Sequence, residues 1–253
     1  MSVPILEPQW AAPRGVRAAF SLRSGGTSTP PWDSLNLGVH VGDDPAAVAE
    51  NRRRLRHTLG LPSEPIWLDQ VHGTAVVHID SATGRQNGRE SPPAVRPRAD
   101  AAVTRERGVV LAVQVADCLP VLLASPESVL GAAHAGWRGL AAGVIEATVA
   151  AMQVPPSQLV AWLGPCIGPA HFEVGDEVRA AFLAADPAAA AAFEANAQGR
   201  WQCDLPQLAR ARLRALGITQ IAGGEWCTAA DPVRFYSHRR DQRTGRMAAL
   251  IWC

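Results

Sequence analysis

VVLAVQVADCLPVLLASPESVLGAAHAGWRG, residues 109–139, is the stretch that decides the fold. Its first run, 109–115, has the length and the β-branched content of a buried strand. Two shorter apolar runs, 121–124 and 129–133, stand on either side of a Ser-Pro turn, and each predicts another strand. The stretch therefore predicts three strands in succession, the first of them buried.

Two reactive side chains stand where these strands give way to loops. Cys118 follows the first strand and His134 follows the third. Rigid strands that end in loops are common positions for reactive side chains. Beyond His134, a glycine-rich turn leads into an apolar segment, 140–152, that predicts a buried helix. The free N–H groups of its first turn, with Arg138 beside them, would face an anion near His134.

The rest of the chain alternates predicted strands and helices without a strict rhythm. The clearest helix starts at a capping Asp44 followed by Pro45 and ends at Gly60, and a second well-signalled helix covers 204–216. The other expected elements are strands at 18–22, 66–68, 75–79, 159–163, 218–222 and 248–252, a helix at 173–185, and an alanine-rich helix or collapsed loop at 187–197. Hairpin-like pairs interrupt the alternation, so we expect mixed sheets flanked by helices.

One polar segment, 81–98, is rich in Pro, Gly and Arg and is the only stretch that resembles a linker. The strands on both sides of it lead to the same kind of chemistry at their ends. We therefore expect a mobile loop there rather than a domain boundary, and one domain over residues 1–253.

Composition argues against several classes of protein. The 24 basic and 23 acidic residues nearly balance, which argues against a nucleic-acid coat or a membrane-surface protein and favours a small partner. No stretch reaches roughly 18 uninterrupted apolar residues, and the first ten residues lack the basic start and apolar run of a signal peptide. The five widely spaced cysteines suggest neither a disulfide framework nor a CxxC site. We therefore expect a cytoplasmic protein.

The candidate chemistry lies in three dispersed residues at predicted strand ends: His72, Cys118 and His134. Two imidazoles and one thiolate suit zinc, and three protein ligands leave a fourth position for water or substrate, as in catalytic zinc sites. From spacing alone, a buried cysteine and two structural histidines are the simpler interpretation. A Cys118 nucleophile with His134 as its base is equally open.

Turns supply candidate anion ligands. Residues 23–28, RSGGTS, form a polar glycine turn whose N–H groups could meet an oxyanion, with Arg23 for charge, although an ordinary loop has the same composition. Arg138 and Arg239 are further candidates, each of them as readily a surface residue. Asp117 and Asp100 are carboxylates available to protonate the base, and Asp117 could as easily orient a metal-bound histidine.

The chain resembles the YfiH/laccase-domain family, which is also described as multicopper polyphenol oxidase-like and as purine nucleoside phosphorylase. The resemblance rests on motifs spread over essentially the whole chain: QVHG at 70–73, ADCLP at 116–120, HAGWRG at 134–139, GPCIG at 164–168, and FYSHRRD followed by TGR at 235–246. The order and number of these motifs make the resemblance far more specific than any one of them.

This resemblance implies a single α+β domain, a layered sandwich with mixed sheets flanked by helices. It implies that the set His72, Cys118 and His134 binds one metal, usually zinc with copper as the alternative, and is catalytic. It also implies phosphorolysis of adenosine, inosine and S-methyl-5'-thioadenosine, with adenosine deamination as a second activity. The expected partners are a purine nucleoside and phosphate, and the chain could form a homodimer. Neither a nucleic acid nor a membrane is expected as a partner. For such a reaction, the glycine turns with Arg23 and Arg138, together with Arg239, are the candidates to hold the phosphate.

Three other interpretations compete with this one. A thiol hydrolase would use Cys118 as nucleophile and His134 as base, and members of the family have been linked to the editing of a peptidoglycan precursor. A copper-dependent polyphenol oxidase would need paired histidines, which seven scattered histidines do not provide. A metal-stabilised interaction module would have a closed four-ligand site and no turnover.

Overall fold

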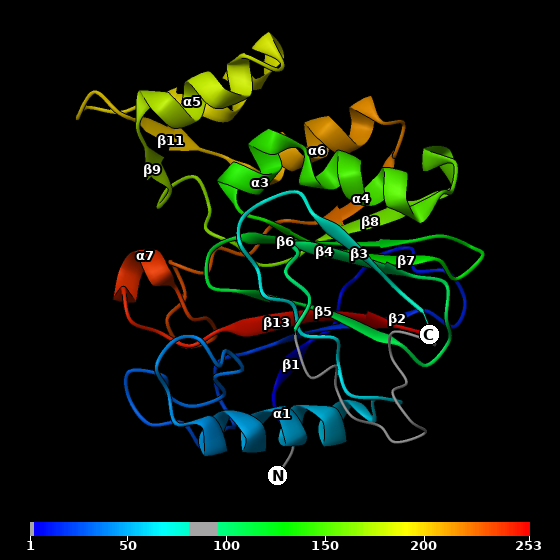
Figure 1. Cartoon of the computed structure of the whole chain (residues 1–253). Helices are drawn as coiled ribbons and strands as arrows, with labels where there is room; N and C mark the ends of the chain where they lie inside the picture. The colour runs from blue at the N-terminus through cyan, green and yellow to red at the C-terminus, as the bar shows by residue number, and fades with distance from the viewer. Residues whose placement is uncertain (1–2, 81–95) are drawn as a thin grey trace.

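The computed structural model describes residues 3–80 and 96–253 and has four layers (Figure 1). Helix α1 (Pro45–Leu59) covers one face of a four-stranded sheet, and a six-stranded sheet packs on its other face. Helices α3 (Trp137–Ala142), α4 (Val144–Met152) and α6 (Leu205–Ala215) cover the far side of the larger sheet. The expected α+β sandwich is confirmed.

Both sheets are assembled from strands that lie far apart in the sequence. The four-stranded sheet is antiparallel and has the order β1 (Ile5–Leu6), β2 (Arg17–Ser21), β13 (Met247–Trp252), β5 (Val110–Val115). The six-stranded sheet has the order β12 (Gln220–Gly223), β8 (Val160–Leu163), β6 (Leu119–Ala124), β7 (Leu130–Ala135), β4 (Ala101–Thr104), β3 (Val76–Ile79). Its outermost pairs, β12 with β8 and β3 with β4, are parallel, and its inner pairs are antiparallel, so the sheet is mixed as expected.

Three apolar layers hold the sandwich together. The layer between the two sheets includes Phe20, Val113 and Leu122, which are fully buried. A second layer packs α1 against the small sheet through Leu55 and Leu250, and a third packs the helices on the large sheet. Strands β5, β6, β7 and β13 are buried along their whole length, because each is covered on both faces.

The ends of α1 follow the sequence signals. The Asp44 side chain accepts a hydrogen bond from the N–H of Ala46, and Gly60 ends the helix in the left-handed conformation at φ 56°. Helix α6 begins in the same way, with Asp204 accepting from the N–H of Gln207. Both predicted helices are confirmed.

Several predicted boundaries are wrong. The helix at 140–152 is two helices, since Gly143 at φ 98° breaks it between α3 and α4. The segment 66–68 contributes an isolated bridge instead of a strand. The predicted helix at 173–185 begins as β9 (Glu173–Val174) and continues as α5 (Asp176–Leu183).

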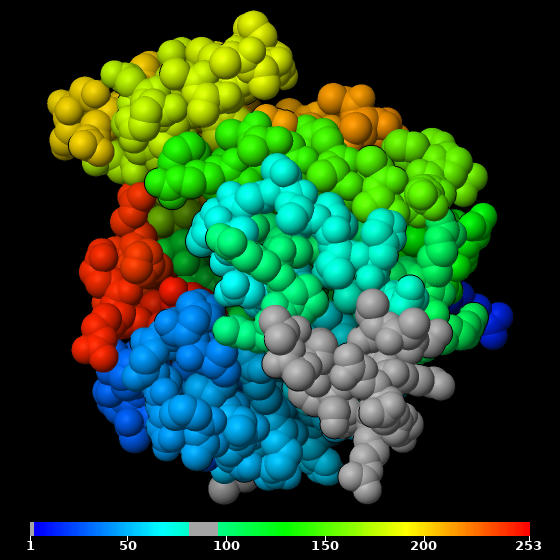
Figure 2. Space-filling model, viewed as in Figure 1, coloured from blue at the N-terminus to red at the C-terminus, as the bar shows by residue number. Residues whose placement is uncertain are grey.

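The alanine-rich segment and three further elements also differ from expectation. The segment 187–197 forms the 3-10 helix η2 (Pro187–Ala192) and then β10 (Phe193–Ala195), which joins β11 (Trp201–Cys203) and β9 in a small sheet. The pattern also missed strand β4, the short helix η1 (Pro156–Gln158) and helix α7 (His238–Asp241). In the space-filling view, α7 lies between the N-terminal loops and the α5 region (Figure 2).

Two sequence expectations concern the limits of the fold. Most of the predicted loop at 81–98 lies outside the described residues, while Arg98 forms a bridge with Asp69. Within the described ranges, no helix combines the length and the apolar character that a membrane crossing requires.

Candidate metal centre

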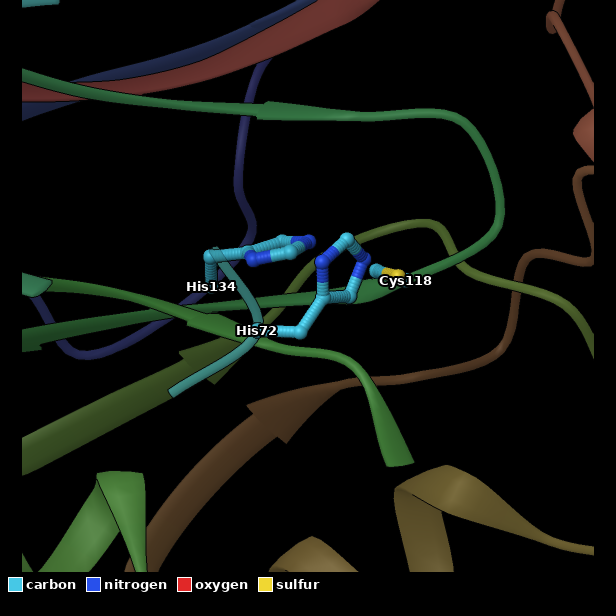
Figure 3. Close-up of side chains that lie close together, drawn as sticks. All are labelled: His72, Cys118 and His134. Atoms are coloured by element: carbon cyan, nitrogen blue, oxygen red, sulfur yellow. The ribbon is translucent and has the colours of Figure 1, made fainter. Parts of the chain in front are cut away.

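Three side chains from distant parts of the sequence converge at one point. His72, Cys118 and His134 each offer a ligand atom, and these atoms lie within 4.8 Å of one another. The two imidazole rings meet edge to face, with centroids 4.8 Å apart, and the sulfur lies beside them (Figure 3). His134 is buried, Cys118 is half-buried and His72 is exposed, so the group is open on the His72 side.

The sheet places two of these residues side by side. Cys118 immediately precedes β6, and the register of β6 with β7 sets Pro120 opposite His134. His134 lies inside β7 rather than after it, because the strand runs on to Ala135. The third residue, His72, comes from the loop before β3 and has φ 62°, a value that a non-glycine residue rarely adopts.

Asp100 fixes both histidines from the side away from the thiol. Its buried carboxylate accepts the Nδ1–H of His134 at 2.9 Å and the backbone N–H of His72 at 2.8 Å. The same carboxylate accepts the backbone N–H groups of Val71 and Gly73. With Nδ1 bonded to a carboxylate, the Nε2 atom of His134 is the one left to bind a metal.

Two glycines of the HAGWRG motif leave room for this arrangement. A Cβ atom on Gly136 would lie 2.8 Å from the Cys118 sulfur and 3.2 Å from the His72 ring. A Cβ atom on Gly139 would lie 2.9 Å from the carbonyl oxygen of Gly73. Any side chain at Gly136 would therefore displace the ligand atoms themselves.

Electrostatics favour an ionised thiol. Burial would raise the pKa of Cys118, but the charge of His134 and hydrogen bonds from both imidazoles lower it to about 6. Burial would likewise lower the pKa of His134, but Cys118 and Asp100 raise it to about 9. In the metal-free protein at neutral pH, the pair is a thiolate facing an imidazolium. A thiolate is the form in which cysteine binds metals and attacks electrophiles.

The donor set fits one zinc or copper ion. A thiolate and two imidazoles match the preference of both metals for sulfur and nitrogen ligands. The carboxylate of Asp100 behind His134 supplies the outer partner that metal-binding histidines commonly have. Three ligands with one exposed side leave a position for water or substrate.

A cavity of 170 Å³ adjoins Cys118 and is also lined by Arg239, the one predicted phosphate ligand found there. Arg239 is exposed, lies over the Phe172 ring and donates to the carbonyl oxygen of Glu173 at 2.9 Å. Its backbone N–H donates to the Asp117 carboxylate at 2.7 Å. The loop that carries the cysteine is thereby tied to helix α7.

The other two predicted phosphate ligands occupy different surroundings. Arg23 donates from Nε, Nη1 and Nη2 to oxygens of Asp33 and Pro232, and its guanidinium lies over the Tyr236 ring. Arg138 is exposed on the first turn of α3 and lies over the Trp137 ring. Their roles toward phosphate stay predictions.

The histidine-orienting role that the sequence suggested for Asp117 belongs to Asp100. Asp117 was the candidate to orient a histidine, but its buried carboxylate accepts from Thr228, Ser237 and Arg239 instead. Asp100 does the orienting. The sequence offered Asp100 as a carboxylate for the base but not for this role, because strand β4, which it directly precedes, was not predicted.

Comparisons with known proteins agree along almost the whole chain. The family model described as multi-copper polyphenol oxidoreductase laccase matches residues 17–253. A purine nucleoside phosphorylase of Pseudomonas aeruginosa is 52% identical and covers 98% of this chain and 97% of its own. The purine nucleoside phosphorylase YfiH of Escherichia coli is 50% identical, covering 98% of both chains.

Solved structures give the same result. The crystal structure of a Neisseria meningitidis protein is 44% identical, covers 98% of both chains and superposes with a TM-score of 0.90. YlmD from Geobacillus stearothermophilus is 32% identical, covers 98% of this chain and 99% of its own, and superposes with a TM-score of 0.83. The chain therefore belongs to the YfiH-type family that carries the description multi-copper polyphenol oxidoreductase laccase.

Proposed function

We propose that this protein is a metal-dependent purine nucleoside phosphorylase that cleaves adenosine, inosine and S-methyl-5'-thioadenosine. The observation that carries the proposal is the convergence of His72, Cys118 and His134 beside a cavity lined by Arg239. Relatives about half identical over nearly their full length bear the name purine nucleoside phosphorylase, which supports the same reaction.

In this reaction an oxygen of phosphate forms a bond to C1′ of the ribose. The C1′–N9 bond breaks, and its electron pair leaves with the purine, which then takes up a proton. The products are the free base and ribose 1-phosphate, or its methylthio derivative. The site must therefore hold an anion at the sugar and stabilise negative charge on the base.

We propose that His72, Cys118 and His134 hold a zinc ion, with copper as the alternative. The bound ion would supply Lewis-acid chemistry at a purine atom or at water. Asp100 holds His134 and the His72 backbone in place through its hydrogen bonds. At the cavity beside Cys118, the Asp117 carboxylate holds the backbone N–H of Arg239 by a hydrogen bond.

We also propose adenosine deamination as a second activity of the same pocket. Water delivered to C6 of the purine would replace the amino group, giving inosine and ammonia. The exposure of His72 supports this proposal, because it leaves one side of the three-residue group open to water.

We further propose that the protein works in the cytoplasm, a reducing compartment, because its five cysteines are free thiols in the structure.

A metal-free thiol hydrolase is the second candidate function, and one observation favours it. The Cys118 pKa of about 6 and the raised pKa of His134 are those of a nucleophile paired with an acid. Such an enzyme would cleave its substrate with water and would work without metal.

Product analysis tests the proposal. Purified protein is incubated with inosine, with and without phosphate, and the sugar product is identified by mass spectrometry. Phosphorolysis predicts cleavage that depends on phosphate and yields ribose 1-phosphate. Free ribose as the main product, formed equally without phosphate, would contradict it.

A further inference from the structure

Arg246 stands at the same end of the sheets as the metal centre. It directly precedes β13, whose first residue, Met247, pairs with Val115 of β5. In this antiparallel ladder the next step sets Arg246 opposite Ala116. Ala116 lines the cavity beside Cys118 and lies two residues before it. Arg246 belongs to the last of the family motifs, but the roles assigned so far do not use it.

The backbone and the stem of Arg246 are held firmly. Its N–H donates to the Asn36 side chain at 2.8 Å, and its carbonyl oxygen accepts from the N–H of Leu37 at 3.0 Å. The stem packs so closely on Gly38 that a Cβ atom there would lie 2.8 Å from the Arg246 Cγ. An arginine fixed in this way loses little conformational entropy when it binds a ligand.

One edge of the Arg246 guanidinium is unused by the protein. Nη1 donates to the carbonyl oxygens of Thr244 and Gly245, both at 3.0 Å. Within residues 3–80 and 96–253, Nε and Nη2 donate to no protein atom. Arg23 differs, because all three of its guanidinium nitrogens already donate to protein oxygens. The Nε–Nη2 edge is the one that binds carboxylate or phosphate with two parallel hydrogen bonds.

The Arg246 guanidinium is partly buried and lies near Cys118 and Asp117. Burial lowers the pKa of Arg246, while the nearby Cys118 and Asp117 act in the opposite direction. The Arg246 guanidinium is therefore a partly dehydrated cation near the thiol of Cys118.

We propose that Arg246 binds the phosphate co-substrate through its Nε–Nη2 edge, close to Cys118. This inference rests on the proposed phosphorolysis for the identity of the anion. The unused Nε–Nη2 edge and its place at the cavity end of the sheets carry the assignment to this residue.

The test compares Arg246→Gln with Arg243→Gln in metal-loaded protein. Arg243 is a matched control because it is exposed, lies three residues earlier and places its guanidinium over the Trp32 ring. Two quantities are measured: phosphate binding by calorimetry without nucleoside, and KM for phosphate with saturating inosine. We expect Arg246→Gln to weaken both by roughly tenfold or more, since a charge-assisted pair is lost. Inosine KM and metal content should change by less than about twofold.

A lysine at the same position guards against a folding defect. Arg246→Lys keeps the charge and the backbone hydrogen bonds but loses the planar fork, so phosphate binding should fall between those of wild type and Arg246→Gln. Equal phosphate affinity in wild type, Arg246→Lys and Arg246→Gln would overturn the inference. Phosphate that binds through Arg246 without any cleavage of inosine would instead overturn the proposed function and leave the anion site standing.

Discussion

The two sides of the metal centre are each built around one buried carboxylate, and the two carboxylates do different work. Asp100 accepts hydrogen bonds from one ligand side chain, His134, and from the backbone around another, His72. Asp117 accepts hydrogen bonds from Thr228, Ser237 and Arg239 and, among the described residues, from no histidine. The two candidate histidine ligands are therefore held by one set of bonds, and the loop of Cys118 is joined to Arg239 at the cavity by another. If the proposed roles hold, metal retention and substrate binding should respond differently to substitution of the two carboxylates.

The largest effect is expected from Asp100→Ala. Removal of this carboxylate leaves three part-buried backbone N–H groups without an acceptor and the buried His134 without a partner. We expect stability to fall by about 3–5 kcal/mol and metal affinity to fall by roughly 10- to 100-fold. Urea unfolding and metal titration measure the two effects. Asp100→Asn keeps the shape of the side chain and one acceptor oxygen, so it should lose less stability and less metal affinity than Asp100→Ala.

A smaller and different loss is expected from Asp117→Asn. The amide would keep some acceptor capacity toward Thr228 and Ser237 but hold the Arg239 backbone less firmly, at a cost of about 1–3 kcal/mol. We expect kcat/KM for inosine to fall about tenfold, while metal content equals that of wild type. Metal loss as large as in Asp100→Ala would show that the two sides are not separate.

The smallest effect concerns the thiol in chelated protein. The lowered pKa predicts that alkylation of Cys118 by iodoacetamide rises with a midpoint near pH 6, because the thiolate forms as pH rises through about 6. Cys166 is an internal control, since burial raises its pKa well above the ordinary thiol value. Peptide mass spectrometry follows both residues. A Cys118 midpoint near pH 8.5, the ordinary pKa of a thiol, would contradict the thiolate–imidazolium pair.

Sequence reasoning succeeded where local signals act alone. The apolar run at 109–115 gave β5, and the capping residues Asp44 and Gly60 gave both ends of α1. It failed where contacts between distant segments determine the secondary structure. The left-handed Gly143 divides an apolar segment that otherwise reads as one helix, and β4 is stabilised by its neighbours β3 and β7 rather than by its own pattern.

The candidate site was predicted in part for the same reason. Side-chain chemistry and the family motifs singled out His72, Cys118 and His134, which the fold brings together. The supporting contacts of Asp100 span between 27 and 34 residues of sequence, and those of Asp117 span more than 100, as no local pattern can show. The free edge of Arg246 likewise becomes visible only when its hydrogen bonds are assigned.

Metal content and activity measured on the same samples test the central claim most directly. Wild type, Cys118→Ser and the control Cys227→Ser, whose half-buried thiol lies outside the cluster, are assayed by plasma mass spectrometry and with inosine and phosphate. We predict that wild type and Cys227→Ser hold the metal, while Cys118→Ser loses it together with its activity. Chelation should abolish wild-type activity and added zinc should restore it. Full phosphorolysis by wild-type protein without bound metal would contradict the account.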